Sequence, residues 1–113
     1  MNRKIRVYKR YFLDFIEQLS EGERRKIDYG LQLLKTQERL STKFVKLIRE
    51  GLFELRTEFN GNIYRVFFIF DDGQIVVLFN GFQKKTQKTP STEIEKALKI
   101  KESFHITQLF VVY

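Results

Sequence analysis

Residues 52–82, LFELRTEFNGNIYRVFFIFDDGQIVVLFNGF, contain three β-prone runs separated by two turn signals. The dipeptides Asn60-Gly61 and Asp72-Gly73 favour two-residue hairpin loops, because both central residues of such loops need a positive φ. The runs beside them are rich in Phe, Ile and Val, which suit a pleated, half-buried surface. The segment therefore predicts a three-strand antiparallel meander.

Two-residue loops would also fix the register of the meander. They place Arg56 opposite Arg65, and Arg65 opposite Asn80. Because successive side chains of a strand alternate between faces, one face becomes almost wholly apolar. We expect helices to cover this face, which collects Phe53, Leu55, Phe59, Tyr64, Val66, Phe68, Phe70, Ile75, Val77 and Phe79.

The opposite face of the predicted sheet carries charge. Like charges that face each other across a strand pair are destabilising, and a charge on a central strand is costly to desolvate, so we interpret Arg56 and Arg65 as functional. One alternative is a solvated ladder in which Glu54 and Glu58 pair with the two arginines; a β-bulge would also move part of the set to the other face. The face collects Glu54, Arg56, Glu58, Ile63, Arg65, Phe67, Ile69, Val76, Leu78, Asn80 and Phe82.

A lysine run follows the third strand. Lys84, Lys85 and Lys88 come shortly after Asn80, and no acidic residue lies between Asp72 and Glu93. An isolated run of this kind is usually a solvated loop, but at the end of a strand beside Arg65 it would extend a cationic trough. The basic residues within 1–13 form either a further phosphate contact or a soluble edge strand.

The remaining elements are predicted from periodicity and capping signals. We expect a strand over 5–11, a helix over 12–19, a second helix opened by the Ser20–Glu23 capping box, and a short helix over 42–50. A last helix follows Pro90, and the apolar tail 108–113 is either an added strand or an oligomer contact. The fold class is thus α+β, a single domain over 1–113 with a twisted antiparallel sheet and helices on one face.

The net charge and the cysteine and histidine content of the chain favour some classes of function and exclude others. The chain has 113 residues and a formal net charge of +7, which favours a polyanionic partner: nucleic acid, an anionic membrane or an acidic protein. The absence of cysteine excludes a disulfide framework and a cysteine nucleophile, and a single histidine gives little support for a metal site or a Ser-His-Asp triad. Without a membrane-spanning or signal segment, we expect a cytoplasmic protein that needs no membrane, metal or cofactor.

The charged face suits RNA chemistry. Arginine presents a planar fork to phosphate oxygens, and crowded cations lower the pKa of a neighbouring lysine, which can then transfer protons near neutral pH. RNA supplies its own nucleophile, the 2′-hydroxyl, so cleavage needs only positioning, charge neutralisation and proton transfer. Phe82 is the aromatic candidate for stacking a base, with Asn80 beside it.

These residues also resemble a known family. Glu54-Leu55-Arg56, Tyr64-Arg65, Gly81-Phe82 with Lys84-Lys85, and Thr89-Pro90 are similar to the pattern of the HigB-like, phage-derived branch of the RelE/ParE toxin superfamily, over residues 40–100. The resemblance implies a RelE-like fold and the toxin of a type II toxin–antitoxin system that cleaves mRNA on the ribosome. It also implies a cognate antitoxin, often one with a helix-turn-helix domain.

The resemblance implies a site as well. Arg56, Arg65, Lys84 and Lys85 would be catalytic, with Arg65 at the scissile phosphate, and Lys88 would bind RNA. On the charged face of the predicted sheet, Asn80 and Phe82 are further RNA-binding residues. The general base stays open among His105, Glu54 and Glu58, because relatives use a tyrosine or histidine near the C-terminus. Two other functions remain: a ParE-type toxin that inhibits DNA gyrase without cutting RNA, and a non-catalytic nucleic-acid-binding accessory protein.

Overall fold

The three β-prone runs form the predicted meander. In the computed structural model, which describes residues 2–84 and 89–112, the strands are β3 (Leu52–Phe59), β4 (Asn62–Phe70) and β5 (Ile75–Lys84). Asn60 and Gly61 adopt φ of 51° and 80°, as a tight two-residue hairpin loop requires. The predicted register of the first hairpin is confirmed, since Arg56 pairs with Arg65.

Two further strands extend the meander into a five-stranded sheet of order β1-β5-β4-β3-β2. β1 (Lys4–Val7) runs parallel to β5, so the sheet is mixed rather than wholly antiparallel. β2 (Val45–Arg49) pairs with β3 in antiparallel fashion. The α+β class is confirmed, although the first strand is shorter than the 5–11 that the sequence predicts.

The short helix predicted over 42–50 is wrong, because β2 occupies this segment. Glu50 and Gly51 both have positive φ, 52° and 76°, and form the turn of a β2–β3 hairpin where a helix C-cap was expected. The apolar spacing of the segment also fits a strand. Pairing with the edge of β3 satisfies backbone hydrogen-bonding groups of both strands. The free energy of these hydrogen bonds and contacts between distant residues outweighs the weak local preference of the segment for helix.

The predicted register of the second hairpin is wrong by two successive shifts. The loop runs from Asp71 to Gln74, so Phe70 pairs with Val76, and a bulge between Val66 and Phe68 adds a second shift. The first shift turns Val76 and Leu78 to the face where Val77 and Phe79 were expected, since one residue of slip exchanges the faces. The second shift restores the faces, so that Phe82, not Asn80, lies opposite Arg65.

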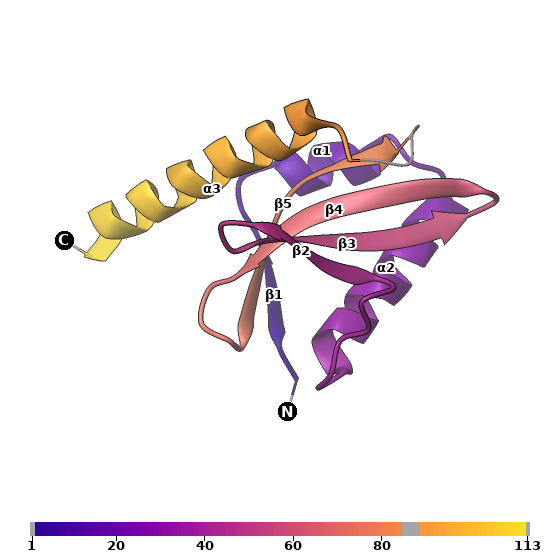
Figure 1. The fold of residues 1–113 in the computed structure, drawn as a ribbon, viewed down its shortest axis with the longest axis horizontal. Helices are drawn as coiled ribbons and strands as arrows, with labels where there is room; N and C mark the ends of the chain where they lie inside the picture. Colours follow the sequence, from indigo (N-terminus) through magenta and orange to yellow (C-terminus); the bar gives the residue numbers. More distant parts are fainter. Residues whose placement is uncertain (1, 85–88, 113) are drawn as a thin grey trace.

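Helices cover both faces of the sheet, whereas one face was expected (Figure 1). α1 (Tyr11–Glu17) and α2 (Glu21–Thr36) pack on one face, and α3 (Ser91–Val112) crosses the other. The capping box of α2 is confirmed by both of its hydrogen bonds between Ser20 and Glu23. Residues 108–112 of the tail predicted as a strand or an oligomer contact continue α3 as helix, so the strand alternative is wrong.

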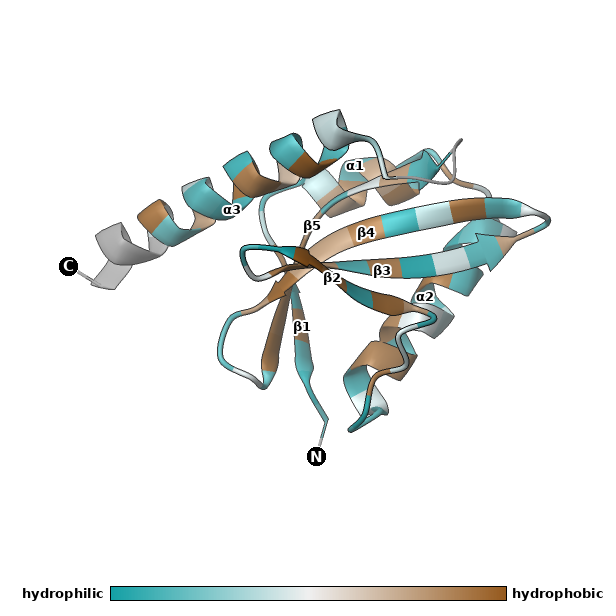
Figure 2. Ribbon diagram, viewed as in Figure 1, coloured by the Kyte–Doolittle hydropathy of each residue, from teal (hydrophilic) through white to brown (hydrophobic). Residues whose placement is uncertain are grey.

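Each face has its own core. The first, beneath α1 and α2, includes Ile27 and Leu34 against Leu55, Val66 and other strand residues. The second lies beneath α3 and includes Ala97, Ile100 and Phe104 against Leu52, Phe67, Ile69, Val77 and Phe79. Figure 2 shows hydrophilic residues interrupting β3 and β4 in the half of the sheet that leads to their shared turn. Within the described residues, no helix has the length and apolarity needed to cross a membrane.

Candidate RNA-binding site on the sheet

Six side chains form a basic half-face on the sheet, next to the core beneath α3. Glu54 and Arg56 follow buried Leu52 at alternate positions of β3, and Arg65 precedes buried Phe67 by two residues on β4. Lys46 of β2 pairs with Glu54, and Phe82 of β5 pairs with Arg65. The basic half-face is therefore Lys46, Glu54, Arg56, Arg65, Phe82 and Lys84.

Arg65 and Glu54 form a buried ion pair at the centre of the basic half-face. Arg65 Nη1 lies 2.5 Å from Glu54 Oε1, and the two side chains are 11% and 1% exposed. Thr89 donates its hydroxyl to the other carboxylate oxygen of Glu54 at 2.8 Å, whereas Arg65 Nε finds no partner among the described residues. Burial lowers the pKa of Arg65 despite the opposing effect of Glu54.

Arg56 faces solvent more than Arg65 does. Its side chain is 34% exposed, and its Nη2 lies 3.1 Å from Glu58 Oε2. With the Glu54–Arg65 pair, this contact produces the two ion pairs that the sequence left as an alternative. The ladder is only partly solvated, however, because its inner pair is buried. Arg56 is thus the more accessible of the two guanidinium groups in the basic half-face.

Lys84 ends β5 beside the two arginines. Partial burial lowers the pKa of Lys84, the positive charge of Arg65 lowers it further, and the carboxylate of Glu54 opposes both. Lys46 and Arg56 add smaller effects in the same direction as Arg65. The ammonium group is therefore a better proton donor here than at an isolated surface position.

Phe82 and Asn80 have different surroundings. Phe82 is half-buried and stacks on Phe67, with ring centroids 5.6 Å apart and planes inclined by 26°. Asn80 lies in the bulge of β5, is 3% exposed, and neither side-chain polar atom finds a partner among the described residues. The predicted placement of Asn80 opposite Arg65 is wrong; Asn80 instead lines a pocket beside α1, together with Phe15 and Phe82.

Of the other predicted site residues, Lys85 and Lys88 lie outside the described residues. His105 is exposed on α3 and lines a groove with Arg49 and Glu50, apart from the basic half-face. Sequence reasoning missed Lys46 and Thr89. Lys46 falls in the segment 42–50 that was predicted as a helix, whereas the pairing of this segment with β3 as a strand places Lys46 opposite Glu54.

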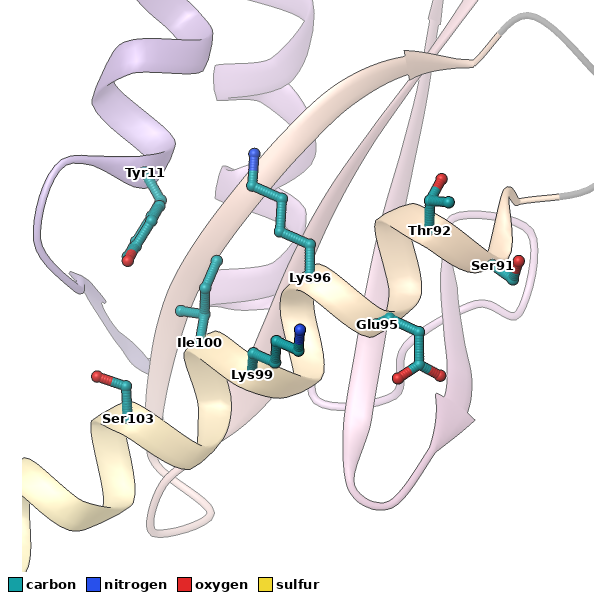
Figure 3. A pocket seen from close by; sticks show the side chains of 8 residues that line it. All are labelled: Tyr11, Ser91, Thr92, Glu95, Lys96, Lys99, Ile100 and Ser103. Atoms are coloured by element: carbon teal, nitrogen blue, oxygen red, sulfur yellow. The ribbon is translucent and has the colours of Figure 1, made fainter.

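A further pocket lies between α1 and α3 (Figure 3). Tyr11 of α1 faces Ile100 and Ser103 of α3 across it, and Lys96 and Lys99 supply positive charge. Tyr11 and Lys96 also line the pocket of Asn80, so the two hollows adjoin. The described residues contain no group of three His, Asp or Glu side chains placed to hold a metal ion.

Residues 14–102 match the family of phage-derived, Gp49-like proteins. The chain belongs to this family. The match spans the whole basic half-face, together with Thr89 and most of α3. The Gp49-like family is a RelE-like toxin family of toxin–antitoxin systems, and such a family implies a cognate antitoxin partner. No curated protein is similar enough to the chain to count as a relative.

Proposed function

We propose that this Gp49-like protein is the toxin of a type II toxin–antitoxin system and that it cleaves mRNA on the ribosome, as HigB-like toxins do. The observation that carries the proposal is that Arg56, Arg65, Lys46 and Lys84 lie together on the basic half-face, next to the core beneath α3. Glu54 and Glu58 offset the charges of the two arginines, but among the described residues Lys46 and Lys84 have no carboxylate partner, and fold stability alone does not favour adding two more cations beside the arginines.

The two arginines differ in accessibility and would therefore differ in role. Arg56 is exposed enough to bind a phosphate through two parallel hydrogen bonds. Arg65, held by Glu54, would act as a positioning residue that supports the strand carrying the site and helps to lower the pKa of Lys84. This changes the role that the resemblance implies for Arg65, and it makes Arg56 the main phosphate contact.

The reaction needs one proton acceptor and one proton donor. The 2′-oxygen attacks the neighbouring phosphorus as its proton passes to a base, and the bond to the 5′-oxygen breaks as that oxygen takes up a proton. Lys84 suits the donor because its pKa is lowered by burial and by Arg65. Glu58 suits the acceptor better than Glu54, because Glu54 is engaged by both Arg65 and Thr89.

Cleavage during translation tests the proposal. The purified protein is added to ribosomes translating a defined mRNA, and the transcript ends are mapped. We expect wild-type protein to cut the mRNA, and Arg56→Ala and Lys84→Ala each to lower the rate at least about a hundredfold. Lys35→Ala, which removes a positive charge in the last turn of α2, should cut like wild type.

Intact transcripts in the wild-type reaction would contradict the proposal. Loss of DNA supercoiling by gyrase when the purified protein is added would then identify a ParE-type toxin. The cognate antitoxin is proposed to block the basic half-face with acidic residues and to carry a helix-turn-helix domain. Co-purification with the product of the adjacent gene tests this partner.

A further inference from the structure

A second basic pocket lies on the other side of Arg56, between α2 and β3. Its walls come from Lys26 and Tyr29 of α2, from Lys43 just before β2, and from residues 56–58 of β3. The cavity measures about 480 Å³, which is within the range of small-ligand sites. We call it the Tyr29 pocket.

Tyr29 presents its ring to solvent in this pocket. The residue is 58% exposed, and the Nζ of Lys26 lies 5.5 Å from the ring centroid. The next residue, Gly30, lets α2 approach β3 closely, because a Cβ at Gly30 would lie 2.9 Å from Thr57 Cγ2. The helix backbone therefore lies close against the sheet beside the exposed ring, and a tyrosine side chain, with only two χ angles, loses little conformational entropy on binding.

The two lysines of the pocket have no carboxylate partner in the part of the chain that the structure describes, although Lys26 lies over the Tyr29 ring. Among the described residues, Lys26 and Lys43 form no ion pair, whereas their neighbours do have partners: Arg24 donates to the carbonyl oxygens that end α1, and Arg25 pairs with Glu21. The one carboxylate of the lining, Glu58, pairs with Arg56. Two positive charges are therefore left for a ligand.

Arg56 connects this pocket with the basic half-face, since it belongs to both. We propose that the Tyr29 pocket binds one nucleotide of single-stranded RNA beyond the cleavage site, with its base stacked on Tyr29 and its phosphate held by Lys26 and Lys43. This inference rests on the proposed function and adds a positioning subsite to it. A planar ring beside two point charges matches a base and its phosphate, whereas an acidic protein segment would need only the charges.

RNA binding by variants tests the subsite without requiring cleavage. A fluorescein-labelled single-stranded RNA of about ten nucleotides is titrated with protein, and its anisotropy is followed at several salt concentrations. We expect Tyr29→Ala to bind about tenfold more weakly and Tyr29→Phe to bind like wild type, because stacking needs the ring and not the hydroxyl. Ile106→Ala, which also truncates a half-exposed apolar side chain, is the matched control and should bind like wild type.

Removing the two lysines should change the salt dependence of RNA binding. In Lys26→Gln/Lys43→Gln, the dependence of log affinity on log salt should flatten by about 0.7 for each phosphate that the variant no longer binds. On the ribosome, Tyr29→Ala should raise KM more than it lowers kcat, since Tyr29 takes no part in the proton transfers of the proposed reaction. An unchanged RNA affinity of Tyr29→Ala, or no RNA affinity of the wild-type protein at low salt, overturns the inference. Wild-type protein that binds RNA through Tyr29 without cutting it contradicts the proposed function alone.

Discussion

Arg65 and Glu54, on neighbouring strands of the sheet, hold each other at 2.5 Å in a nearly solvent-free position. A buried charge without a partner is far more costly than a paired one, so each residue makes the other tolerable inside the fold. The pair therefore supports the structure beneath the site, while Arg56 and Lys84 stay accessible above it.

Breaking this pair should destabilise the protein strongly. Glu54→Gln leaves the Arg65 guanidinium buried and unpaired, and we expect the free energy of unfolding to fall by about 3–5 kcal/mol. Urea denaturation followed by circular dichroism measures this loss. Glu58→Gln, which breaks the more exposed pair with Arg56, should cost less than about 1 kcal/mol.

The double variant Glu54→Gln/Arg65→Met serves as the control for this explanation. It removes both charges, so it should be more stable than Glu54→Gln alone. Equal or lower stability of the double variant would show that the loss came from packing and not from an uncompensated charge.

The lowered pKa of Lys84 should respond to its neighbours. Arg56→Gln removes one of the positive charges that disfavour the Lys84 ammonium, so the pKa of Lys84 should rise toward its ordinary value. Heteronuclear NMR titration of the lysine side chains measures the change. Arg25→Gln, which removes a remote positive charge, should leave the Lys84 titration where it is.

The same shift links stability to pH. The folded state disfavours the charged form of Lys84, so the unfolded chain binds the Lys84 proton more tightly than the folded chain does. The charged Lys84 therefore lowers the free energy of unfolding most at low pH, where the ammonium group is fully protonated in both states. Wild-type protein should therefore gain stability relative to Lys84→Met as the pH rises toward about 10, the ordinary range of lysine. A difference that does not vary with pH would argue against the shift.

Tyr64 predicts loss of stability in alkali. Burial, together with the nearby Glu23 carboxylate to which Tyr64 donates a hydrogen bond, raises the pKa of Tyr64 to about 12. The unfolded chain ionises its tyrosines near pH 10, so between about pH 10 and pH 12 the fold progressively loses the stability that neutral Tyr64 contributes.

Tyr64→Phe has no group to ionise at this position. Its free energy of unfolding, lower than that of wild type at pH 7 because the hydrogen bond is lost, should approach the wild-type value as the pH rises from 10 to 12. Urea midpoints measured across this range test the prediction, with Tyr29→Phe as the exposed control. A constant gap between wild type and Tyr64→Phe would contradict it.

Gly81 should tolerate no side chain. A Cβ at Gly81 would overlap the ring of Phe15, closer than real Cβ contacts come. We expect Gly81→Ala to lower the free energy of unfolding by about 1–3 kcal/mol through overpacking. A second substitution, Phe15→Leu, should restore part of the loss, whereas Gln83→Ala on the same strand should change little; a Gly81→Ala protein as stable as wild type would refute the overlap.

Much of the fold follows from short-range signals. The Asn60-Gly61 loop supplies the positive φ values of its hairpin and thereby fixes Arg56 opposite Arg65. The Ser20–Glu23 capping box begins α2 with hydrogen bonds among neighbouring residues. Predictions of this kind hold because the deciding contacts lie within a few residues, or within one hairpin, and are little affected by the rest of the chain.

The site was predictable in part. Arg56, Arg65, Lys84 and Phe82 do share a face, because the two register shifts in β5 cancel in their effect on side-chain direction. Asn80 falls in the bulge between those shifts, and its position could not be read from alternation. Lys46 entered the site only through the pairing of β2 with β3.

The sequence by itself determined the α+β class, the first hairpin, the capped helix α2 and the basic character of one sheet face. Only the tertiary structure decided that residues 45–49 form a strand, that α3 covers the second face and that Arg65 is sealed against Glu54. The physical reason is the separation along the chain between the residues that interact. Turn and capping energies are local, whereas strand pairing, helix docking and the burial of a charge depend on partners that can lie 35 residues away, as for Thr89 and Glu54.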